Sequence, residues 1–344
     1  MKKINLSKLV NKSKQDKSQL PARITNDTVA EHREQIIAGG RRFKYPVQYA
    51  RQKLVRNAAI IAFISIILLS VLVFQQLYFA QNSSDFIYRI TQLLPVPVAT
   101  IDNEPVRYSD YLMQYRASEY YLRKYDEIKL NSEDGKRQLD GIKRQVLNTA
   151  EANAYARKLA REKSISISEK EIDDAIASKR NTVNGQITQE AYDASTMMLY
   201  RWSPQDYRQA IRQSLLRSRV AFAVDDNARS LADRASSLIA TGKDLRAVAG
   251  ELGNGLAVQS PGLVDTTSSF SGLNVSEVAK LQPNVISGTL KSSTDDGYYF
   301  VRVTQKTDTQ VNFEFIQIKL TAFSAKVAEL KQGNRVHEFI KVVE

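Results

Sequence analysis

Residues that could carry out catalysis or bind a metal ion are few in this chain. Its 344 residues include no cysteine and only two histidines, His32 and His337. Without cysteine there can be no thiolate zinc site, iron–sulfur cluster, disulfide or cysteine nucleophile. Two histidines leave almost no material for a histidine-based metal site or a Ser-His-Asp triad. The glycines form no G-x-x-x-x-G-K-[ST] phosphate loop, so we expect no nucleotide, no metal and no cofactor.

Three pairs of adjacent carboxylates are the remaining candidates for acid–base chemistry. They are Asp173-Asp174, Asp225-Asp226 and Asp295-Asp296. Side chains that are neighbours in a helix do not face each other, and turn or cap roles account for the last two pairs. We therefore interpret all three pairs as solvated surface. What remains is a binding protein, or an enzyme built from carboxylates, hydroxyls and shape.

Positive charge is concentrated at the N-terminus. The chain has a net charge of +12, and residues 1–56 hold 14 Lys or Arg against 4 Asp or Glu, which leaves +2 for the rest. A nucleic-acid-binding surface would need the basic excess on the folded part of the chain. We expect no nucleic-acid partner, and we expect the stretch before Pro21, rich in Lys, Ser, Asn and Gln, to be disordered.

An apolar stretch follows this basic tail. From Ala58 to Phe74 only Ser65 and Ser70 are polar. At 1.5 Å per residue, residues 57–80 form about 36 Å of helix, enough to cross a hydrocarbon core of about 30 Å. We predict an uncleaved single-pass transmembrane helix over 57–80, with a buried core helix as the alternative.

The charges on the two sides of this helix predict its orientation. Residues 81–85, which follow the helix, include no basic residue. Six basic residues closely precede it: Arg41, Arg42, Lys44, Arg51, Lys53 and Arg56. By the positive-inside rule, the basic tail 1–56 is cytoplasmic. Residues 81–344 are then extracytoplasmic, and the protein belongs to the cell membrane.

The extracytoplasmic part begins with a helical half. A linker over 81–97 leads to a short strand, a turn and a set of helices over 98–224. Ser168 and Glu171 fit a capping box, and Ser203, followed by a proline and an acid, fits a second helix start. We also predict a helix over 133–163, and a helix whose N-cap is Ser109, with Asp110 in its first turn.

Tyrosines are concentrated in the helix predicted after Ser109. Six lie in the range 108–125. Four residues there share one helical face, which we interpret as core: Tyr111, Tyr115, Leu122 and Tyr125. Tyr120 and Tyr121 lie partly off that face. Because aromatic rings offer contact area with little sequence demand, we predict that these two contact extended polypeptide.

A mixed half follows over 225–320, and a short amphipathic segment, 321–344, ends the chain. The runs 298–304 and 311–320 are β-branched and aromatic, and six polar residues separate them, which predicts a hairpin. The second run alternates imperfectly, which is typical of a strand buried on both faces. The fold class is therefore α+β, with a single N-terminal transmembrane helix, a helical domain and a domain with a small antiparallel sheet.

Five short motifs occur in a recognisable order. They read VATIDNEPV (98–106), ISISEKEI (165–172), GKDLRAVA (242–249), LQPNVIS (281–287) and GYYFVRV (297–303). In that order they are similar to VATVNGEPI, I-x-V-S-x-x-E-I, G-x-D-F-x-x-L-A, L-x-P-G-E-I-S and G-Y-H-I-I-x-V of the bacterial SurA/PrsA-type extracytoplasmic foldases. The resemblance implies a SurA N-terminal-like chaperone domain over 98–224 and a parvulin (PpiC-type) peptidyl-prolyl isomerase domain over 225–320.

The chain departs from the parvulin pattern at both histidines that hold the substrate's prolyl amide. Tyr299 replaces the histidine of the G-Y-H-I-I strand. The H-I-L-V strand, which normally opens the domain, has its best match at 315–318, where Phe315 takes the histidine position. We therefore expect no isomerase activity. The alternative is a parvulin-type isomerase that acts through an apolar pocket including Leu281, Phe300 and Phe315.

The position of the H-I-L-V match at 315–318 affects the predicted topology of the domain. It follows the final strand of the family pattern, so the parvulin-like domain is predicted to be circularly permuted. The alternative is a domain that lost its first strand and gained an unrelated extension.

Together these features predict a membrane-anchored, extracytoplasmic, chaperone-like protein that binds unfolded or extended polypeptides. An active isomerase and an envelope assembly scaffold with one folded partner are the alternatives. No catalytic residue is predicted, and the predicted binding residues are Tyr120, Tyr121, Leu281, Tyr299, Phe300 and Phe315.

Overall fold

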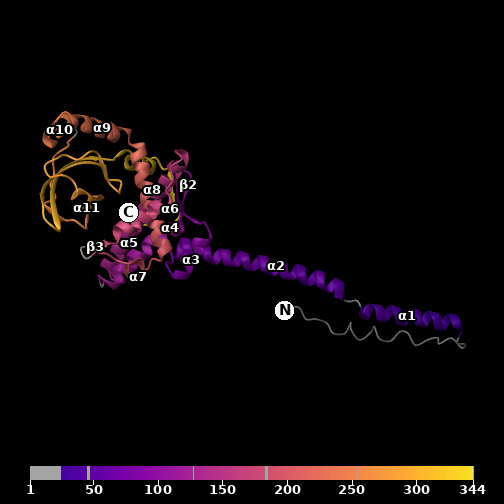
Figure 1. Cartoon of the computed structure of the whole chain (residues 1–344). Coiled ribbons are helices and arrows are strands. Elements are labelled where there is room, and N and C mark those ends of the chain that lie inside the picture. Colours follow the sequence, from indigo (N-terminus) through magenta and orange to yellow (C-terminus); the bar gives the residue numbers. More distant parts are fainter. Residues whose placement is uncertain (1–24, 45–46, 127, 183–184, 254, 344) are drawn as a thin grey trace. The chain divides into compact units, whose positions relative to one another are not determined.

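The computed structural model describes residues 25–44, 47–126, 128–182, 185–253 and 255–343 (Figure 1). The chain divides into two compact units, Met1–Leu72 and Val73–Glu344. The stretch before Pro21, predicted to be disordered, lies outside the described residues. Helices, with several small antiparallel sheets, make up the structure, so the expected α+β class is confirmed.

The first unit contains α1 (Asn26–Lys44) and most of α2 (Val47–Phe74). Within the described residues, Lys53–Phe79 is the one helix long and apolar enough to cross a membrane, with a mean hydropathy of 2.7. None of its apolar window is buried against protein. It covers most of the predicted span, 57–80.

The last turn of this apolar helix belongs to the second unit. It is a π-helical turn, Gln75–Phe79, in which Leu77 is almost fully buried. The hydroxyl of Tyr108 donates to the carbonyl oxygen of Leu77 at 2.6 Å, and the hydroxyl of Tyr78 donates to that of Pro97 at 2.6 Å. The predicted boundary between residues 80 and 81 therefore separates Leu77 from the core it packs in.

The structure differs from the prediction at 81–97, where a helix replaces most of the expected linker. This helix, α3 (Asp85–Leu93), is capped by the side chain of Ser84. Its buried face carries Ile87 and Tyr88. A capping serine followed by apolar residues at helical spacing accounts for the helix.

A three-stranded sheet joins the two ends of the second unit. β1 (Pro97–Ile101) and β2 (Glu104–Arg107) form a hairpin, and β11 (Val336–Glu338) pairs with the other edge of β1. The turn residues Asp102 and Asn103 both have positive φ, 50° and 65°, as a type I′ turn requires. The predicted strand and turn after residue 98 are therefore confirmed.

Five helices build the rest of the helical half: α4 (Tyr108–Lys124), α5 (Glu133–Glu162), α6 (Glu169–Lys179), α7 (Gln189–Tyr200) and α8 (Pro204–Val224). The two-residue strands β3 (Asn181–Thr182) and β4 (Gly185–Gln186) pair between α6 and α7. The predicted capping box at Ser168 is present, and the helix start predicted at Ser203 is confirmed, with a capping box between Ser203 and Asp206. The helix predicted over 133–163 is confirmed as α5.

The predicted cap at Ser109 is wrong, because α4 begins one residue earlier, at Tyr108. No side chain caps this helix. The ring of Tyr108 is fully buried, so packing rather than a capping hydroxyl fixes the start. Asp110 does lie in the first turn, where it pairs with Arg157 at 2.9 Å.

The mixed half begins with α9 (Asp226–Ala240) and α10 (Leu245–Leu252) and includes a four-stranded antiparallel sheet in the order β5-β10-β9-β8. Its strands are β5 (Leu263–Asp265), β8 (Leu290–Lys291), β9 (Gly297–Lys306) and β10 (Gln310–Lys319). The predicted hairpin is the β9–β10 pair. The short elements β6 (Ser269–Phe270), β7 (Leu273–Asn274) and α11 (Val275–Val278) complete this half.

Both faces of the β9–β10 hairpin are buried, as the imperfect alternation predicts. Phe300 and Ile316 pack with the apolar residues of α9 and α10. Tyr299 and Phe315 pack on the other face with Leu273 and other residues around β7 and α11. Aromatic and aliphatic residues at consecutive positions therefore each have a core to enter.

The C-terminal segment 321–344 returns to the helical half. α12 (Ala322–Gln332) places Phe323 and Leu330 in the same core as α4 and α5, and Ile340 follows them there. Lys331 of α12 pairs at 2.5 Å with Glu151 of α5, whose side chain is fully buried. His337 lies in β11, opposite Thr100 of β1, so it occupies a sheet position.

Candidate functional site

Seven aromatic rings form a continuous row over α4, α7 and the start of α8. We name this row the aromatic strip, and its members are Tyr120, Tyr121, Tyr125, Tyr192, Tyr200, Trp202 and Tyr207. Successive ring centroids lie between 5.2 and 6.4 Å apart. The Tyr121–Tyr200 contact, at 6.3 Å, joins α4 to α7.

A crevice of about 950 Å³ begins where the strip reaches α8. One wall carries Tyr192, Tyr200, Trp202 and Tyr207, with Ile211 and Leu215 of α8. The facing wall comes from two loops of the mixed half and is rich in hydroxyl groups: Thr267, Ser268, Ser269, Ser293 and Thr294. An aromatic wall therefore faces a polar, uncharged one.

Contacts on α8 hold the facing wall in place. The hydroxyl of Ser218 donates to the carbonyl oxygen of Thr294 at 2.7 Å. Arg217 pairs with Asp295 at 3.3 Å. The crevice is thus tied directly to the loop that carries Ser293 and Thr294.

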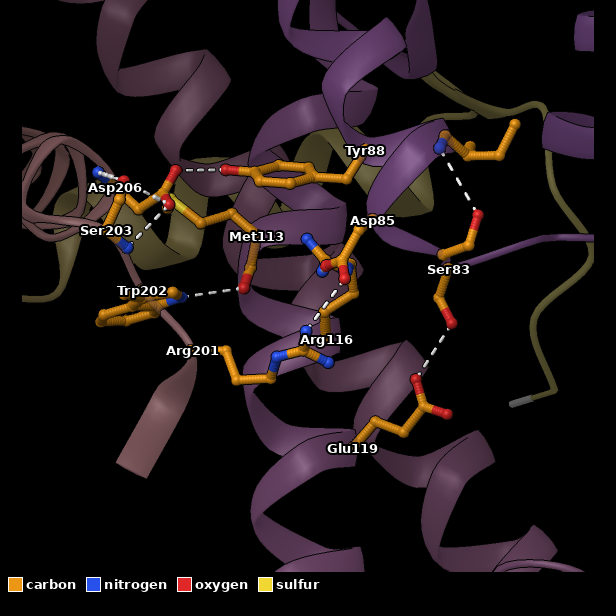
Figure 2. Close-up of polar contacts among 12 residues, drawn as sticks. Ser83, Asp85, Tyr88, Met113, Arg116, Glu119, Arg201, Trp202, Ser203 and Asp206 are labelled. Carbon is orange, nitrogen blue, oxygen red and sulfur yellow. Dashed lines mark hydrogen bonds and ion pairs between the residues drawn. The ribbon is translucent and has the colours of Figure 1, made fainter. Parts of the chain in front are cut away.

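Several rings of the strip are fixed by hydrogen bonds at their polar ends. The indole nitrogen of Trp202 donates to the carbonyl oxygen of Met113 at 3.0 Å (Figure 2). The hydroxyls of Tyr192 and Tyr207 lie 2.7 Å apart. The hydroxyl of Tyr125 donates to the carbonyl oxygen of Met198 at 3.0 Å. The polar atoms of these four rings are hydrogen-bonded within the protein, so their ring faces are what they offer to a partner.

A polar network around Asp206 lies next to Trp202 of the strip (Figure 2). Asp206 closes the capping box with Ser203 and also accepts from the hydroxyl of Tyr88. Burial, together with Asp206, raises the pKa of Tyr88, so this hydroxyl remains protonated and keeps donating at neutral pH. Burial and the Tyr192 hydroxyl likewise raise the pKa of Tyr207.

Arg201 sits at the end of α7 with a left-handed backbone, φ 56°. Its guanidinium pairs with Asp85 at 2.9 Å and lies 5.6 Å from the ring centre of Tyr120. The ammonium of Lys124 lies 5.9 Å from the same ring. Two cations thus lie close to the ring of Tyr120, whereas Tyr121 has 38% of its surface exposed.

Exposed apolar side chains widen the strip on α7. Met197 and Met198 are 47% and 56% exposed, and Tyr125 and Tyr200 are also exposed. Methionine adapts its shape to a partner because its side chain is unbranched and flexible. The combination favours contact with apolar side chains of varied shape.

The structure places two of the six predicted site residues in the aromatic strip and the other four in the mixed half. Tyr120 and Tyr121 lie in the aromatic strip. Tyr299, Phe300 and Phe315 lie in the sheet of the mixed half and are at most 2% exposed, so they offer no accessible surface in this conformation.

Leu281 is half-buried and packs with the cluster that contains Tyr299 and Phe315. The rings of Tyr299 and Phe315 lie 5.7 Å apart. Burial raises the pKa of Tyr299, so its hydroxyl is neutral. These residues form core packing rather than an open pocket.

The assignment of Tyr125 to the core was wrong, because 37% of its surface is exposed. Sequence reasoning also missed Tyr192, Tyr200, Trp202 and Tyr207. Four aromatic residues within 192–207, flanking a helix start, were the signal that could have found them. In the described residues, no group of three His, Asp or Glu side chains is placed to hold a metal ion.

Comparison with known protein families gives one match. The family model for the SurA-like N-terminal domain matches residues 48–221, from the apolar helix to α8. No curated protein and no solved structure matches the chain. Because the match spans half of the chain, the protein belongs to the family that carries a SurA-like N-terminal domain.

Proposed function

We propose that this protein is a membrane-anchored, extracytoplasmic chaperone that holds unfolded or extended polypeptides in the crevice and along the aromatic strip. The SurA-like N-terminal domain is a chaperone-like module of periplasmic foldases. The observation that carries the proposal is the continuity of seven aromatic rings from an exposed helix end into a crevice of about 950 Å³.

The two walls of the crevice suit the two parts of an extended chain. Aromatic faces and methionines take apolar side chains of many shapes. The hydroxyls of Thr267, Ser268 and Ser293 already donate to Asp265 and Gly272, at 2.7, 2.7 and 2.9 Å. Their oxygens therefore remain as acceptors for backbone N–H groups. Such recognition reads the backbone and apolar character, and it requires no defined sequence.

Anchoring follows from the apolar helix and its flanking charges. The helix is exposed along its apolar window, whereas a core helix would be buried, and this favours a membrane span. The basic residues before it place the tail 1–56 in the cytoplasm by the positive-inside rule. Clients would then be polypeptides that emerge on the outer face of the membrane.

Suppression of aggregation tests the proposal. The full chain in lipid nanodiscs should slow the aggregation of an unfolded protein without ATP, at near-stoichiometric ratio. The double variant Tyr121→Gln/Tyr200→Gln should lose most of this effect, because it removes the rings that join α4 to α7 and glutamine preserves helix propensity.

The control replaces an exposed apolar residue outside the strip. Val285→Gln, at a position that is 53% exposed, should protect the client as well as the unaltered protein does. Equal protection by the Tyr121/Tyr200 variant would refute the strip as the binding surface. Failure to bind any unfolded chain, with tight capture of one folded envelope protein, would favour the scaffold function.

We also propose that the mixed half is a circularly permuted, degenerate parvulin-like domain. The hairpin supports this: Phe315 of β10 lies beside Tyr299 of β9 in an antiparallel pair, as the first and last strands of the ordinary fold do. Deleting residues 311–344 should abolish amide protection in β9, whereas deleting 322–344, which spares β10, should preserve it. Equal protection in both variants would contradict the permutation.

A further inference from the structure

A second hollow lies at the point where the apolar helix leaves the membrane in the anchoring proposed above. It has a volume of about 790 Å³ and is lined on one side by Phe74, Tyr78 and Phe79 at the end of the helix. The chain's C-terminal segment forms the other side, with Glu338, Phe339 and Lys341. Residues far apart in sequence thus enclose one space beside the helix end.

The lining is rigidly built. The ring of Phe74 lies 4.7 Å from that of Tyr78, and the ring of Phe339 lies 6.4 Å from Tyr78 on its other side. The backbone N–H of Phe339 donates to the carbonyl oxygen of Val98 at 2.9 Å. The side chain of Gln81 donates to the carbonyl oxygen of Lys341 at 2.8 Å. The C-terminal segment therefore closes around the helix end.

Apolar surface in this hollow is exposed to an unusual degree. Phe79 is 77% exposed, Phe74 is 54% exposed and Phe339 is 45% exposed. Three phenylalanine rings grouped in this way mark a contact surface. The described residues leave much of the surface of these rings uncovered.

The depth of these rings in the bilayer, in the anchoring proposed above, indicates which molecules surround them. Counted from Arg56 at 1.5 Å per residue, Phe74 and Phe79 lie about 27 and 35 Å along the helix. That is the far boundary of a hydrocarbon core about 30 Å thick. In the proposed anchoring, the hollow therefore lies at the level where acyl chains meet headgroups.

The charge of the lining favours an anionic headgroup. Glu338 is neutralised by Arg144, which pairs with it at 2.5 Å. Lys341 is exposed and forms no ion pair with any described residue. One unpaired ammonium therefore stands at the rim of an apolar hollow.

We propose that this hollow seats a phospholipid of the outer leaflet, with its acyl chains against Phe74, Phe79 and Phe339 and its anionic headgroup at Lys341. The proposal rests on the membrane anchoring proposed above but not on chaperone activity. The bound lipid would fix the extracytoplasmic unit against the membrane surface.

Fluorescence quenching by brominated lipids tests the seat. Trp202 is the single tryptophan of the chain, so the variant Trp202→Phe/Phe339→Trp carries one reporter in the hollow. Reconstituted in vesicles of chain-brominated phosphatidylglycerol, this variant should lose most of its fluorescence. The control variant Trp202→Phe/Val285→Trp, with its reporter at an exposed site of the mixed half, should keep its fluorescence.

Separate experimental results test the headgroup contact and the other possible occupants of the hollow. Adding Lys341→Glu to the reporter variant should reduce quenching by brominated phosphatidylglycerol but not by brominated phosphatidylcholine. Absence of quenching in protein that stays with the vesicles after an alkaline wash would overturn the lipid seat and leave anchoring intact. Loss of the protein in that wash would overturn anchoring itself. Efficient disulfide dimers of a Phe339→Cys variant would show that a second copy fills the hollow instead.

Discussion

Tyr299 and Phe315 occupy the positions that the proposed parvulin resemblance assigns to the two histidines of an isomerase site. Their side chains are buried in the sheet, 5.7 Å apart. Burial raises the pKa of Tyr299, and phenylalanine has no polar atom, so neither supplies a donor–acceptor pair near pH 7. We predict that the protein leaves the cis–trans relaxation of Ala-Pro and Leu-Pro test peptides at its uncatalysed rate, tens to hundreds of seconds.

Variants distinguish a true activity from a contaminant in that assay. A catalysed rate that Leu281→Ala, Phe300→Ala or Phe315→Ala abolishes would establish an isomerase that works through an apolar pocket. A catalysed rate insensitive to all three would report a contaminating enzyme. The variants must therefore be assayed beside the unaltered protein.

Asp225 is a single residue that joins the two halves. One carboxylate oxygen accepts from the backbone N–H groups of Thr321 and Ala322 at 2.7 and 3.0 Å, and the other accepts from that of Ala228 at 2.9 Å. Burial alone would raise the pKa of Asp225, but these three hydrogen bonds outweigh it and lower the pKa. The ionised carboxylate therefore stabilises the fold.

The sign of this pKa shift sets a pH dependence. Because the pKa is lower in the folded state, the contribution is fully present above the unfolded value of about 3.9 and is lost as the pH falls through the folded value. At pH 7, Asp225→Asn should lower the free energy of unfolding by about 1–3 kcal/mol, measured by urea unfolding. The difference should shrink below pH 4.

The neighbouring carboxylate provides the control for that measurement. Asp226 is exposed and pairs only with Arg229 one turn away. Asp226→Asn should change the free energy of unfolding by well under about 1 kcal/mol. Equal losses in both variants would contradict a specific role for Asp225.

At the scale of elements, local signals predicted more than distant ones. The capping box at Ser168, the helix start at Ser203 and the hairpin over 298–320 were correct because each depends on residues that are close in sequence. The pairing of β11 with β1 joins residues more than 230 positions apart. No local pattern encodes such a contact, so the segment 321–344 was predicted as a separate end.

The junction between the apolar helix and α3 gives an element-scale prediction. Leu77 is buried in the core that also contains Tyr108 and Ile101. Leu77→Ala should lower the free energy of unfolding of the unit Val73–Glu344 by about 2–5 kcal/mol, through lost burial and a cavity. Hydrogen exchange of the amides in β1 and α4, in nanodiscs, measures this loss.

The exposed neighbour of Leu77 is the matched control. Phe79, two residues on in the same π-helical turn, has 77% of its surface exposed. Phe79→Ala should leave hydrogen exchange in β1 and α4 unchanged. If both variants behave alike, the helix end is a passive tether rather than part of the folded unit.

At the scale of the whole molecule, the site exists only because the two halves form one unit. The aromatic wall comes from α7 and α8, and the hydroxyl wall comes from loops about 60 to 100 residues further along the chain. Sequence pattern identified Tyr120 and Tyr121 as off the core stripe, since helical periodicity is local. It could not bring Trp202 opposite Ser293, because that depends on the Ser218–Thr294 contact and the return of the chain at Asp225.

Orientation across the membrane gives the last prediction. By the positive-inside rule, the proposed orientation has residues 1–56 in the cytoplasm, and every binding feature described above would then lie on the other side. The chain has no cysteine, so single substitutions give clean labels. In cells with a permeable wall or outer membrane, a membrane-impermeant maleimide should label Ser236→Cys, at an exposed position of α9, without lysis. The same reagent should label Ser13→Cys only after the membrane is disrupted. Labelling of Ser13→Cys in intact cells, with Ser236→Cys protected, would show the opposite topology. Extracytoplasmic polypeptides could then not reach the crevice.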